Sequence, residues 1–425
     1  MKFKNIIALW AVAATCCLSC VYHNDDNPNV YPKPEPIPTP EPEPIPDRNP
    51  EYIKAAYSPN CIMVQPGTSV DIPVMKAYAM WDLYREFLGD VELDGQKAEA
   101  VLLWQDTPGL IVNVGMVEGK TEEESALVAS TSEKVGNAVV GVRIKGEIRW
   151  SWHLWVTKYN PDLQQITYGK VYNWDNNEDG VTDYVFMDRN LGAVNEGWLI
   201  GEDTADSLAA CGLFYQWGRK DPFPGDSRFR RTNSTDTDYF DSKPIYDSKG
   251  NRLDEGTDGG IHLKRTKDLP SDNTLAASII DPMAFILGES SYNDWLCRDE
   301  PVKITKCDTL WCGATASKTP FDPCPEGWQV PHDKNGQFIW NGLDKATTDY
   351  SPLGVFPYAG LRYRNGGGCL KNSGFATSIW SGTPATGIGN AYELSIYISP
   401  SEKKPVIKKD ISCRSDGQSV RCARI

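Results

Sequence analysis

The chain has 425 residues, a formal net charge of -14 and 12 cysteines. A balance this acidic argues against nucleic acid and against electrostatic binding to anionic lipid. The hydrophobic content of 40% is normal for a folded protein, and 14 Trp with 19 Tyr form a heavy aromatic load.

The first 19 residues have the pattern of an export signal. Two lysines precede a short apolar run from Ile6 to Ala14. The run is shorter than the roughly 20 apolar residues that a membrane-spanning helix needs, which favours a cleaved signal. The segment resembles the bacterial lipobox, whose acylated cysteine becomes the first residue of the mature chain. By that resemblance Cys20 is the lipidation site, with Cys16 and Cys17 as rival acceptors and an ordinary signal peptide as the other interpretation.

Residues 20–50 are expected to be a tether. Proline occupies nearly every second position between Pro32 and Pro46, which excludes helix and central strand and favours extended polyproline II. Such a segment is a semi-rigid spacer. Asp25 and Asp26 follow the cysteine closely and resemble the acidic export signal of Bacteroidota lipoproteins. The expected location is therefore the outer membrane, lipid-anchored and exposed at the cell surface.

Residues 51–165 are expected to form an Ig-like β-sandwich. Six or seven short apolar runs are separated by turn residues, which is the pattern of a small all-β domain. Only Tyr78 to Leu88 suggests a helix. The predicted strands lie at Cys61–Val64, Val70–Val74, Ala100–Trp104, Leu110–Val114, Ala138–Ile144 and Trp150–Val156.

Three tryptophans in the last of these strands have two interpretations. Trp150 and Trp152 are alternate residues and share one face of the strand, so with Trp155 they form either a ligand platform or part of the core. Core packing is the preferred interpretation. His153 is interpreted as an ordinary strand residue.

The remaining residues, 166–425, are rich in glycine and aromatic residues. A set of motifs there resembles the Fibrobacter succinogenes major paralogous domain, which occurs on secreted lipoproteins and fimbrillin-associated proteins of Bacteroidota. The motifs are Asp188–Ala193, Gly212–Asp221, Asp322–Pro331, Phe356–Arg362, Ser378–Thr383 and Gly417–Arg424.

The resemblance implies a fold for this second segment. That family is similar to the C-type lectin-like fold, in which short twisted sheets and long loops are closed by a disulfide between early and late strands. The expected class is therefore mainly β, with an α+β C-terminal part. Cys324 and Cys422 are the implied disulfide pair, and Cys413 with Cys422 is the rival. Trp328 and Trp380 are expected in the core rather than as sugar-stacking residues.

One loop carries a pattern of ligands for a hard cation. Side-chain oxygens at Asp175, Asn177, Asp179 and Asp183, with the carbonyl of Val181, alternate as Ca²⁺ requires. The pattern is not a complete EF-hand, because Phe186 stands where a bidentate glutamate belongs. Structural Ca²⁺ is one expectation, and a solvated hairpin turn rich in Asp and Asn is the other.

The sequence contains none of the common catalytic motifs for serine hydrolases, zinc proteases or nucleotide binding, and it has only four histidines. We therefore expect a non-catalytic adhesion or binding module for an extracellular glycan or protein, with a possible fimbrial accessory or tip role. The main alternative is a structural subunit of a pilus or polysaccharide-uptake complex that contacts other fimbrial subunits. A glycan-active enzyme ranks third.

Overall fold

The computed structural model describes most of the chain after residue 49. The described ranges are 50–163, 170–196, 205–229, 241–253, 260–269, 274–288, 294–296, 308–311, 317–334, 336–343, 353–385, 389–399 and 405–424. These residues belong to one compact unit that runs from Thr39 to Ile425. Cys20, the tether and the expected boundary between residues 165 and 166 lie outside the described residues.

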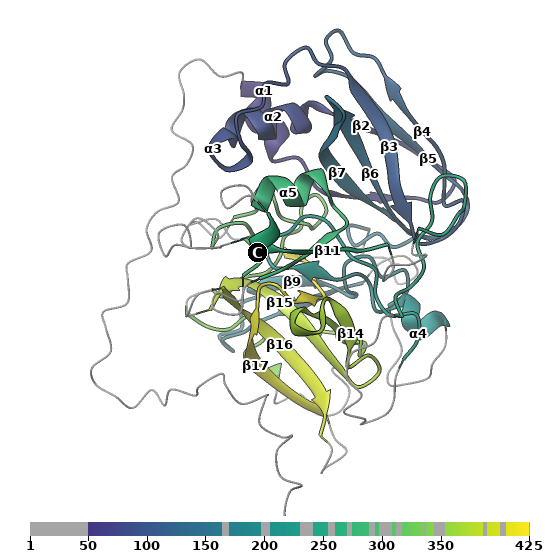
Figure 1. Cartoon of the computed structure of the whole chain (residues 1–425). Helices are drawn as coiled ribbons and strands as arrows, with labels where there is room; N and C mark the ends of the chain where they lie inside the picture. Colours follow the sequence, from purple (N-terminus) through teal and green to yellow (C-terminus); the bar gives the residue numbers. More distant parts are fainter. Residues whose placement is uncertain are drawn as a thin grey trace, which may run out of the picture. The chain divides into compact units, whose positions relative to one another are not determined.

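The fold is mainly β, with several separate sheets, none closed, which confirms the expected class. In the N-terminal half, seven strands form two sheets of order β1-β7-β6-β3 and β2-β5-β4 (Figure 1). β1 runs parallel to β7, and the other pairs are antiparallel. The strands are β1 (Cys61–Val64), β2 (Ser69–Pro73), β3 (Ala98–Gln105), β4 (Ile111–Val117), β5 (Ala126–Thr131), β6 (Gly136–Ile144) and β7 (Glu147–Val156).

This half also contains three short helices, one before β1 and two between β2 and β3 in the chain. The helix expected over residues 78–88 is present but divided, because Tyr84 leaves the helical conformation at φ -108°. The three helices are α1 (Pro50–Ala56), α2 (Met75–Leu83) and α3 (Arg85–Leu88). Since the interior of α2 is buried on all sides, including Trp81, this helix is a core element rather than a surface one.

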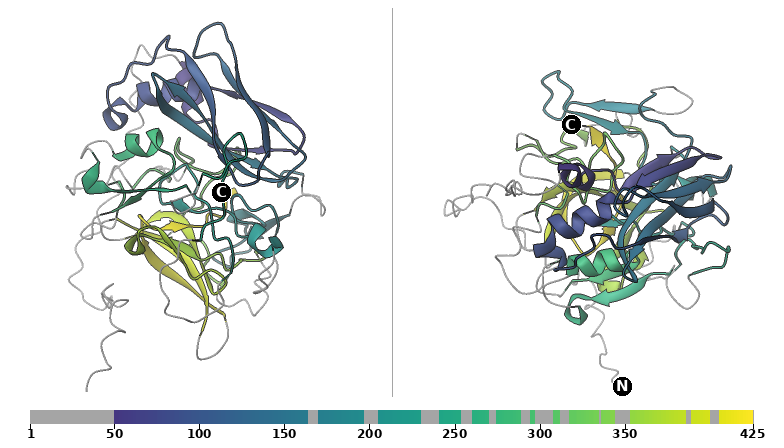
Figure 2. Two further views of the ribbon diagram at one scale, coloured as in Figure 1. Left: turned by 45° about the vertical axis from the view of Figure 1, so that its right-hand side comes forward. Right: turned by 90° about the horizontal axis from the view of Figure 1, so that it is seen from above.

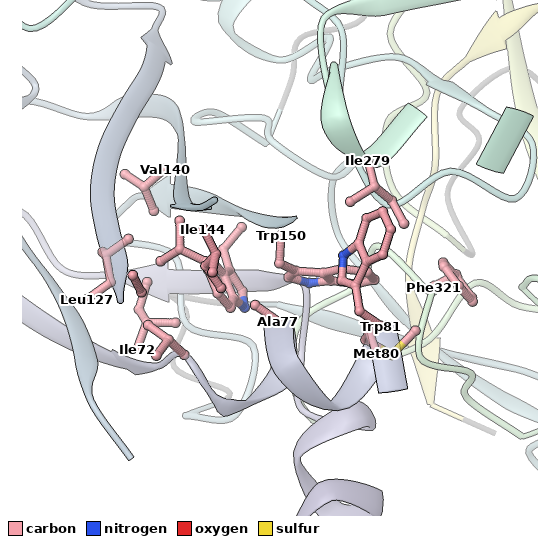
Figure 3. Packing of buried hydrophobic residues seen from close by; sticks show 14 of the residues in the cluster. Ile72, Ala77, Met80, Trp81, Leu127, Val140, Ile144, Trp150, Ile279 and Phe321 are labelled. Carbon is pink, nitrogen blue, oxygen red and sulfur yellow. The ribbon is translucent and has the colours of Figure 1, made fainter. Parts of the chain in front are cut away.

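The core of this half mixes residues from both sheets, from α2 and from distant parts of the chain. Figure 3 shows Trp150 of β7 between Ala77 and Trp81 of α2, with Ile279 and Phe321 from the C-terminal half on the same side. The indole Nε1 of Trp150 donates to Asn60 Oδ1 at 3.1 Å. The Nδ2 of Asn60 in turn donates to the carbonyls of Pro320 and Asp322. The two halves therefore share one interior.

Both faces of β7 are buried. Trp150, Trp152 and Leu154 point into the core beneath the second sheet, whereas Trp155 packs in a separate cluster with residues of the C-terminal half. Every residue of β7 except the first is buried. The strand period of two assigns alternate residues to opposite faces, so the outer face of this sheet is covered by the second half of the chain.

The C-terminal half has small sheets joined by long connections. Its sheets have the orders β10-β18-β13-β14, β11-β12, β15-β16-β17 and β19-β9-β8, and Figure 2 shows β15–β17 in yellow and the N-terminal strands in blue. Its strands are β8 (Val171–Trp174), β9 (Tyr184–Met187), β10 (Tyr215–Gln216), β11 (His262–Arg265), β12 (Ala284–Leu287), β13 (Leu361–Tyr363), β14 (Cys369–Lys371), β15 (Ala376–Pro384), β16 (Asn390–Ile398), β17 (Pro405–Cys413), β18 (Gly417–Gln418) and β19 (Ala423–Arg424). Its helices are α4 (Ala205–Ala209), α5 (Thr274–Ile280) and the 3-10 turns η1 (Thr266–Asp268) and η3 (Arg364–Gly366).

A disulfide ties the end of the chain into this half. Cys324 and Cys422 are bonded, 98 residues apart, which is the pairing that the family resemblance implies and not the rival pairing of Cys413 with Cys422. Both are fully buried. Beside the disulfide, β19 pairs with β9, so that Ala423 lies opposite Phe186. The last strand is thus held by a covalent bond and by a sheet.

Candidate functional site

The tryptophans singled out from the sequence are core residues. Trp150, Trp152 and Trp155 are at most 1% exposed, which excludes the ligand platform for this conformation. Trp328 is 2% exposed and Trp380 is fully buried, as core packing requires. The preference for core packing at these five positions is confirmed.

The loop expected to hold Ca²⁺ is a turn that satisfies its own polar groups. The two carboxylate oxygens of Asp175 accept four backbone N–H groups, from residue 177 to residue 180. Asp179 accepts from Val181 N and from the side chain of Asn177. Slight desolvation raises the pKa of Asp175, but these backbone hydrogen bonds lower it by more, so its pKa lies below the usual value.

A cation bound at Asp175 would have to displace these backbone hydrogen bonds. Three backbone N–H groups converge on Asp175 Oδ1 and one donates to Oδ2, so a cation would have to compete mainly at Oδ1. Asp183 lies apart, accepting from Asn176 N and pairing with Lys334 at 3.7 Å. Among the residues described, no group of three or more His, Cys, Asp or Glu side chains is placed to hold a metal. The Ca²⁺ site therefore stays a prediction, and in this conformation the five residues do not form a ligand shell.

A small pocket lies where the two halves meet. Its polar and reactive side chains are those of Asp106 and Asn137 from the N-terminal half, with Cys211, Asp226 and Lys243 from the C-terminal half. Lys243 Nζ lies 3.1 Å from the buried Asp106 carboxylate. Glycines, alanines, Val194, Leu208 and Leu213 form the remaining wall, so the pocket is a small recess of mixed polar and apolar character.

A hydrogen-bonded chain leads from this pocket into the interior. Asn137 Nδ2 donates to Asp106 Oδ2 at 3.0 Å, and Asn137 Oδ1 lies 2.9 Å from His153 Nε2. His153 Nδ1 lies 3.3 Å from the hydroxyl of Tyr215. Burial lowers the pKa of His153 to about 3, against a smaller opposing effect of Asp106. The imidazole is therefore neutral, with Nε2–H donating to Asn137 and Nδ1 accepting from Tyr215.

The nucleophiles near this pocket are not activated. Burial raises the pKa of the Cys211 thiol, nearby Asp226 raises it further, and Lys243 opposes this only in part. A thiol that stays protonated is a poor nucleophile. Cys211 also donates to the carbonyl of Ser207.

A second charged group is fully internal. Ser151 Oγ donates to Asp221 Oδ1 at 2.6 Å, and Lys220 Nζ lies 2.8 Å from the same carboxylate. Lys220 also stands 4.6 Å above the ring of Trp150. Burial lowers the pKa of Lys220, an effect that Asp221 partly offsets. These contacts bond the outer face of β7 to the C-terminal half.

A partly buried tyrosine lies at one surface of the C-terminal half. We call it the Tyr363 surface: Leu263, Tyr363, Asn365 and Lys371. Lys371 Nζ lies 4.4 Å from the centroid of the Tyr363 ring, and Asn365 Nδ2 donates to the Tyr363 hydroxyl at 2.9 Å. Leu263 is 49% exposed. The ring is only partly exposed, and Lys371 and Asn365 already contact its face and its hydroxyl. A polar ligand at this surface would therefore share these groups with the protein.

Comparisons with known proteins found no matching family model, no matching curated protein and no matching solved structure. In the described part of the chain, no helix has the length and apolar character needed to cross a membrane.

The sequence signalled some of these features and missed others. The acidic loop and the disulfide were visible as patterns. The Tyr363 surface was not, because Leu263 and Tyr363 are 100 residues apart and neither belongs to a ligand motif. The pocket was not predicted either, because Asp106 and Lys243 are far apart in the sequence and come together only in the folded chain.

Proposed function

We propose that this protein is a lipid-anchored binding protein of the cell surface, held on a stiff tether and without catalytic activity of its own. Its ligand is an extracellular glycan or protein, and a fimbrial accessory or tip role belongs to the same proposal. The observation that carries it is the shared interior of the two halves, in which Trp150 contacts both. Because the two halves are packed together, the tethered protein would present one rigid surface instead of two domains that move independently.

The finer fold belongs to this proposal. Two packed sheets of four and three strands, in the orders β1-β7-β6-β3 and β2-β5-β4, support an Ig-like sandwich, in which β1 has joined the sheet of β7 as its parallel neighbour. A C-type-lectin-like arrangement of the second half is supported by its short sheets and by the Cys324–Cys422 closure of its last strand. We infer an Ig-like domain fused to a lectin-like one.

Three groups of buried titratable residues support a non-catalytic role. Lys220 and Asp221 are paired with each other, His153 is neutral and bonded at both nitrogens, and the Cys211 thiol is held protonated. Groups committed to internal bonds stabilise the fold but do not exchange protons with a substrate.

The test is binding of the full chain, in detergent micelles, to glycan and host-protein arrays. Any ligand found is then tested against Tyr363→Ala, with Tyr57→Ala as the control, because Tyr57 is a surface tyrosine of the N-terminal half, 46% exposed. We expect at least tenfold weaker binding, about 1.4 kcal/mol, for Tyr363→Ala only. Absence of any ligand, together with recovery of the protein in a sheared fimbrial fraction, would favour a structural subunit and overturn the proposal.

A further inference from the structure

We propose that the buried carboxylate of Glu393 holds an alkali-metal cation, Na⁺ or K⁺, together with neighbouring side-chain oxygens. These are the oxygens of Ser378, Asp410 and Gln418. Glu393 lies in the middle of β16, opposite Asp410 of β17, and β15 pairs with β16 on the other side. Figure 1 shows these three strands side by side. The inference does not depend on the proposed ligand-binding function.

Glu393 is a buried acid without a cationic partner. Its exposed fraction is 6%. In the described part of the chain no lysine, arginine or histidine forms an ion pair with it, and the charged groups that act on it are two further carboxylates, Asp410 and Asp416. Burying an ionised carboxylate without compensation is strongly unfavourable. The described residues therefore leave this place short of positive charge.

The missing charge is a single unit, because the two neighbouring carboxylates have positive partners. Asp410 pairs with Lys408 at 2.8 Å. Asp416 accepts the backbone N–H of Arg364, and the Arg364 side chain attracts it. A monovalent cation beside Glu393 therefore balances the cluster, whereas a divalent one would leave a surplus of positive charge.

Gln418 supplies an independent observation. Its side chain is fully buried, and its Oε1 has no hydrogen-bond partner. The Nε2 of the same amide donates to the Glu393 carboxylate, so Oε1 lies beside that carboxylate. Turning the amide over would place oxygen against oxygen. A buried polar atom without a partner indicates a bound water or ion, and beside an uncompensated carboxylate a cation satisfies both groups.

The atoms at this place are those that a hard cation binds. A carboxylate has about four lone-pair directions, and Glu393 accepts only from Ser378 Oγ at 3.3 Å and from Gln418 Nε2. Directly opposite residues of an antiparallel pair have Cβ atoms about 4.5–5.5 Å apart, which brings the Asp410 carboxylate within reach of the same cation. A set of carboxylate, amide and hydroxyl oxygens, without sulfur or imidazole, favours a hard ion.

Asp410 connects the site to solvent. β17 is the last strand of its sheet, and the Asp410 side chain is 42% exposed. A hydrated cation arriving at this edge exchanges part of its water shell for the protein oxygens and keeps water on its outer side. Because water competes with the protein on that side, the expected affinity is low, and the measurement must use cation concentrations in the range of physiological salt.

The test compares thermal unfolding of the full chain, in detergent micelles, in NaCl, KCl and tetramethylammonium chloride at equal concentration. Tetramethylammonium is too large for the site, whereas a cation that binds only the native state raises Tm. Burial raises the pKa of Glu393 to about 8, so the comparison is made one pH unit above that value, where a proton competes little. We expect a higher Tm in NaCl or KCl, and the salt with the larger rise identifies the ion.

Four variants separate this site from general effects of salt. The rise should vanish in Glu393→Gln, which keeps the shape of the side chain, and should diminish in Asp410→Asn. It should persist in Glu99→Gln, a strand glutamate opposite Arg143, and in Asp179→Ala, which changes the acidic loop. Equal Tm in all three salts, or a rise that survives in Glu393→Gln, overturns the proposal and leaves a proton as the group that neutralises Glu393.

Discussion

The hydroxyl of Ser151 lies 2.6 Å from a carboxylate oxygen of Asp221, although 70 residues separate them in the chain. Ser151 is on the outer face of β7, and Asp221 follows β10 in the C-terminal half. The contact is buried, and the Lys220 ammonium pairs with the same Asp221 carboxylate. A polar bond of this kind fixes how the two halves pack.

We predict that Asp221→Ala destabilises the protein by about 3–5 kcal/mol, because it leaves the Lys220 ammonium buried without its partner. Urea unfolding followed by tryptophan fluorescence measures this change. The control is Glu196→Ala, which breaks the exposed Lys170–Glu196 pair and should cost no more than about 1 kcal/mol. Similar losses in the two variants would contradict the prediction.

The N-terminal half should not fold alone. Residues 51–160 expressed separately would expose the outer faces of β6 and β7, including Trp155 and Val139, which the C-terminal half covers. We expect aggregation or a molten state, with sharp near-UV signals only in the longer chain. A soluble, monomeric fragment with a cooperative unfolding transition would show that the outer face tolerates water.

Stability should fall as the pH rises toward 8. Burial, together with the Asp410 carboxylate opposite it on β17, raises the pKa of Glu393 from 4.5 to about 8. Between these two values the native state holds a proton that the unfolded state releases. The free energy of unfolding therefore decreases with pH in that window, by at most about 1.4 kcal/mol per pH unit from this group.

Glu393→Gln should remove much of that dependence, since the amide keeps hydrogen-bonding capacity toward Gln418 and Ser378 without a titratable proton. We expect the variant to gain stability relative to wild type between pH 5 and pH 8, measured as the urea midpoint at several pH values. Glu99→Gln, at an exposed position of β3, is the control. An unchanged pH slope in the Glu393 variant would sink the prediction.

The acidic loop gives a test for calcium. If Asp175, Asn177, Asp179, Val181 and Asp183 bind Ca²⁺, thermal unfolding shifts to a lower temperature with chelator, and Asp179→Ala abolishes the shift. Asp247→Ala is a matched control, because Asp247 also caps backbone N–H groups in an exposed turn. No shift with chelator in the wild type would leave the loop as a self-capped turn.

The strands of the N-terminal half were predictable where small or polar residues alternate with large apolar ones along the chain. Val140 and Val142, like Trp150 and Trp152, follow the period of two, and their burial agrees with it. By the same period, Ser151 and His153 lie on the opposite face of the strand. They are buried because the C-terminal half covers that face, and a period within one strand carries no information about a distant segment.

The C-terminal half was less predictable from local pattern. Its strands are as short as two residues, as in β10, β18 and β19. Such elements depend on distant partners, such as Trp380, whose Nε1 donates to the carbonyl of Tyr215. The pairing of Cys324 with Cys422 came from resemblance, because nine cysteines beyond residue 20 allow many pairings.

The parallel pairing of β1 with β7 also has a mechanical meaning. Tension on the chain ahead of Pro50 enters the folded body through α1 and reaches β1, whose four residues are aligned with His153 to Val156. Pulling along β1 loads these hydrogen bonds in shear, all at once, instead of opening them one after another. If residues 20–50 form the predicted tether, the first strand of the folded body is therefore held by bonds that share a pulling force.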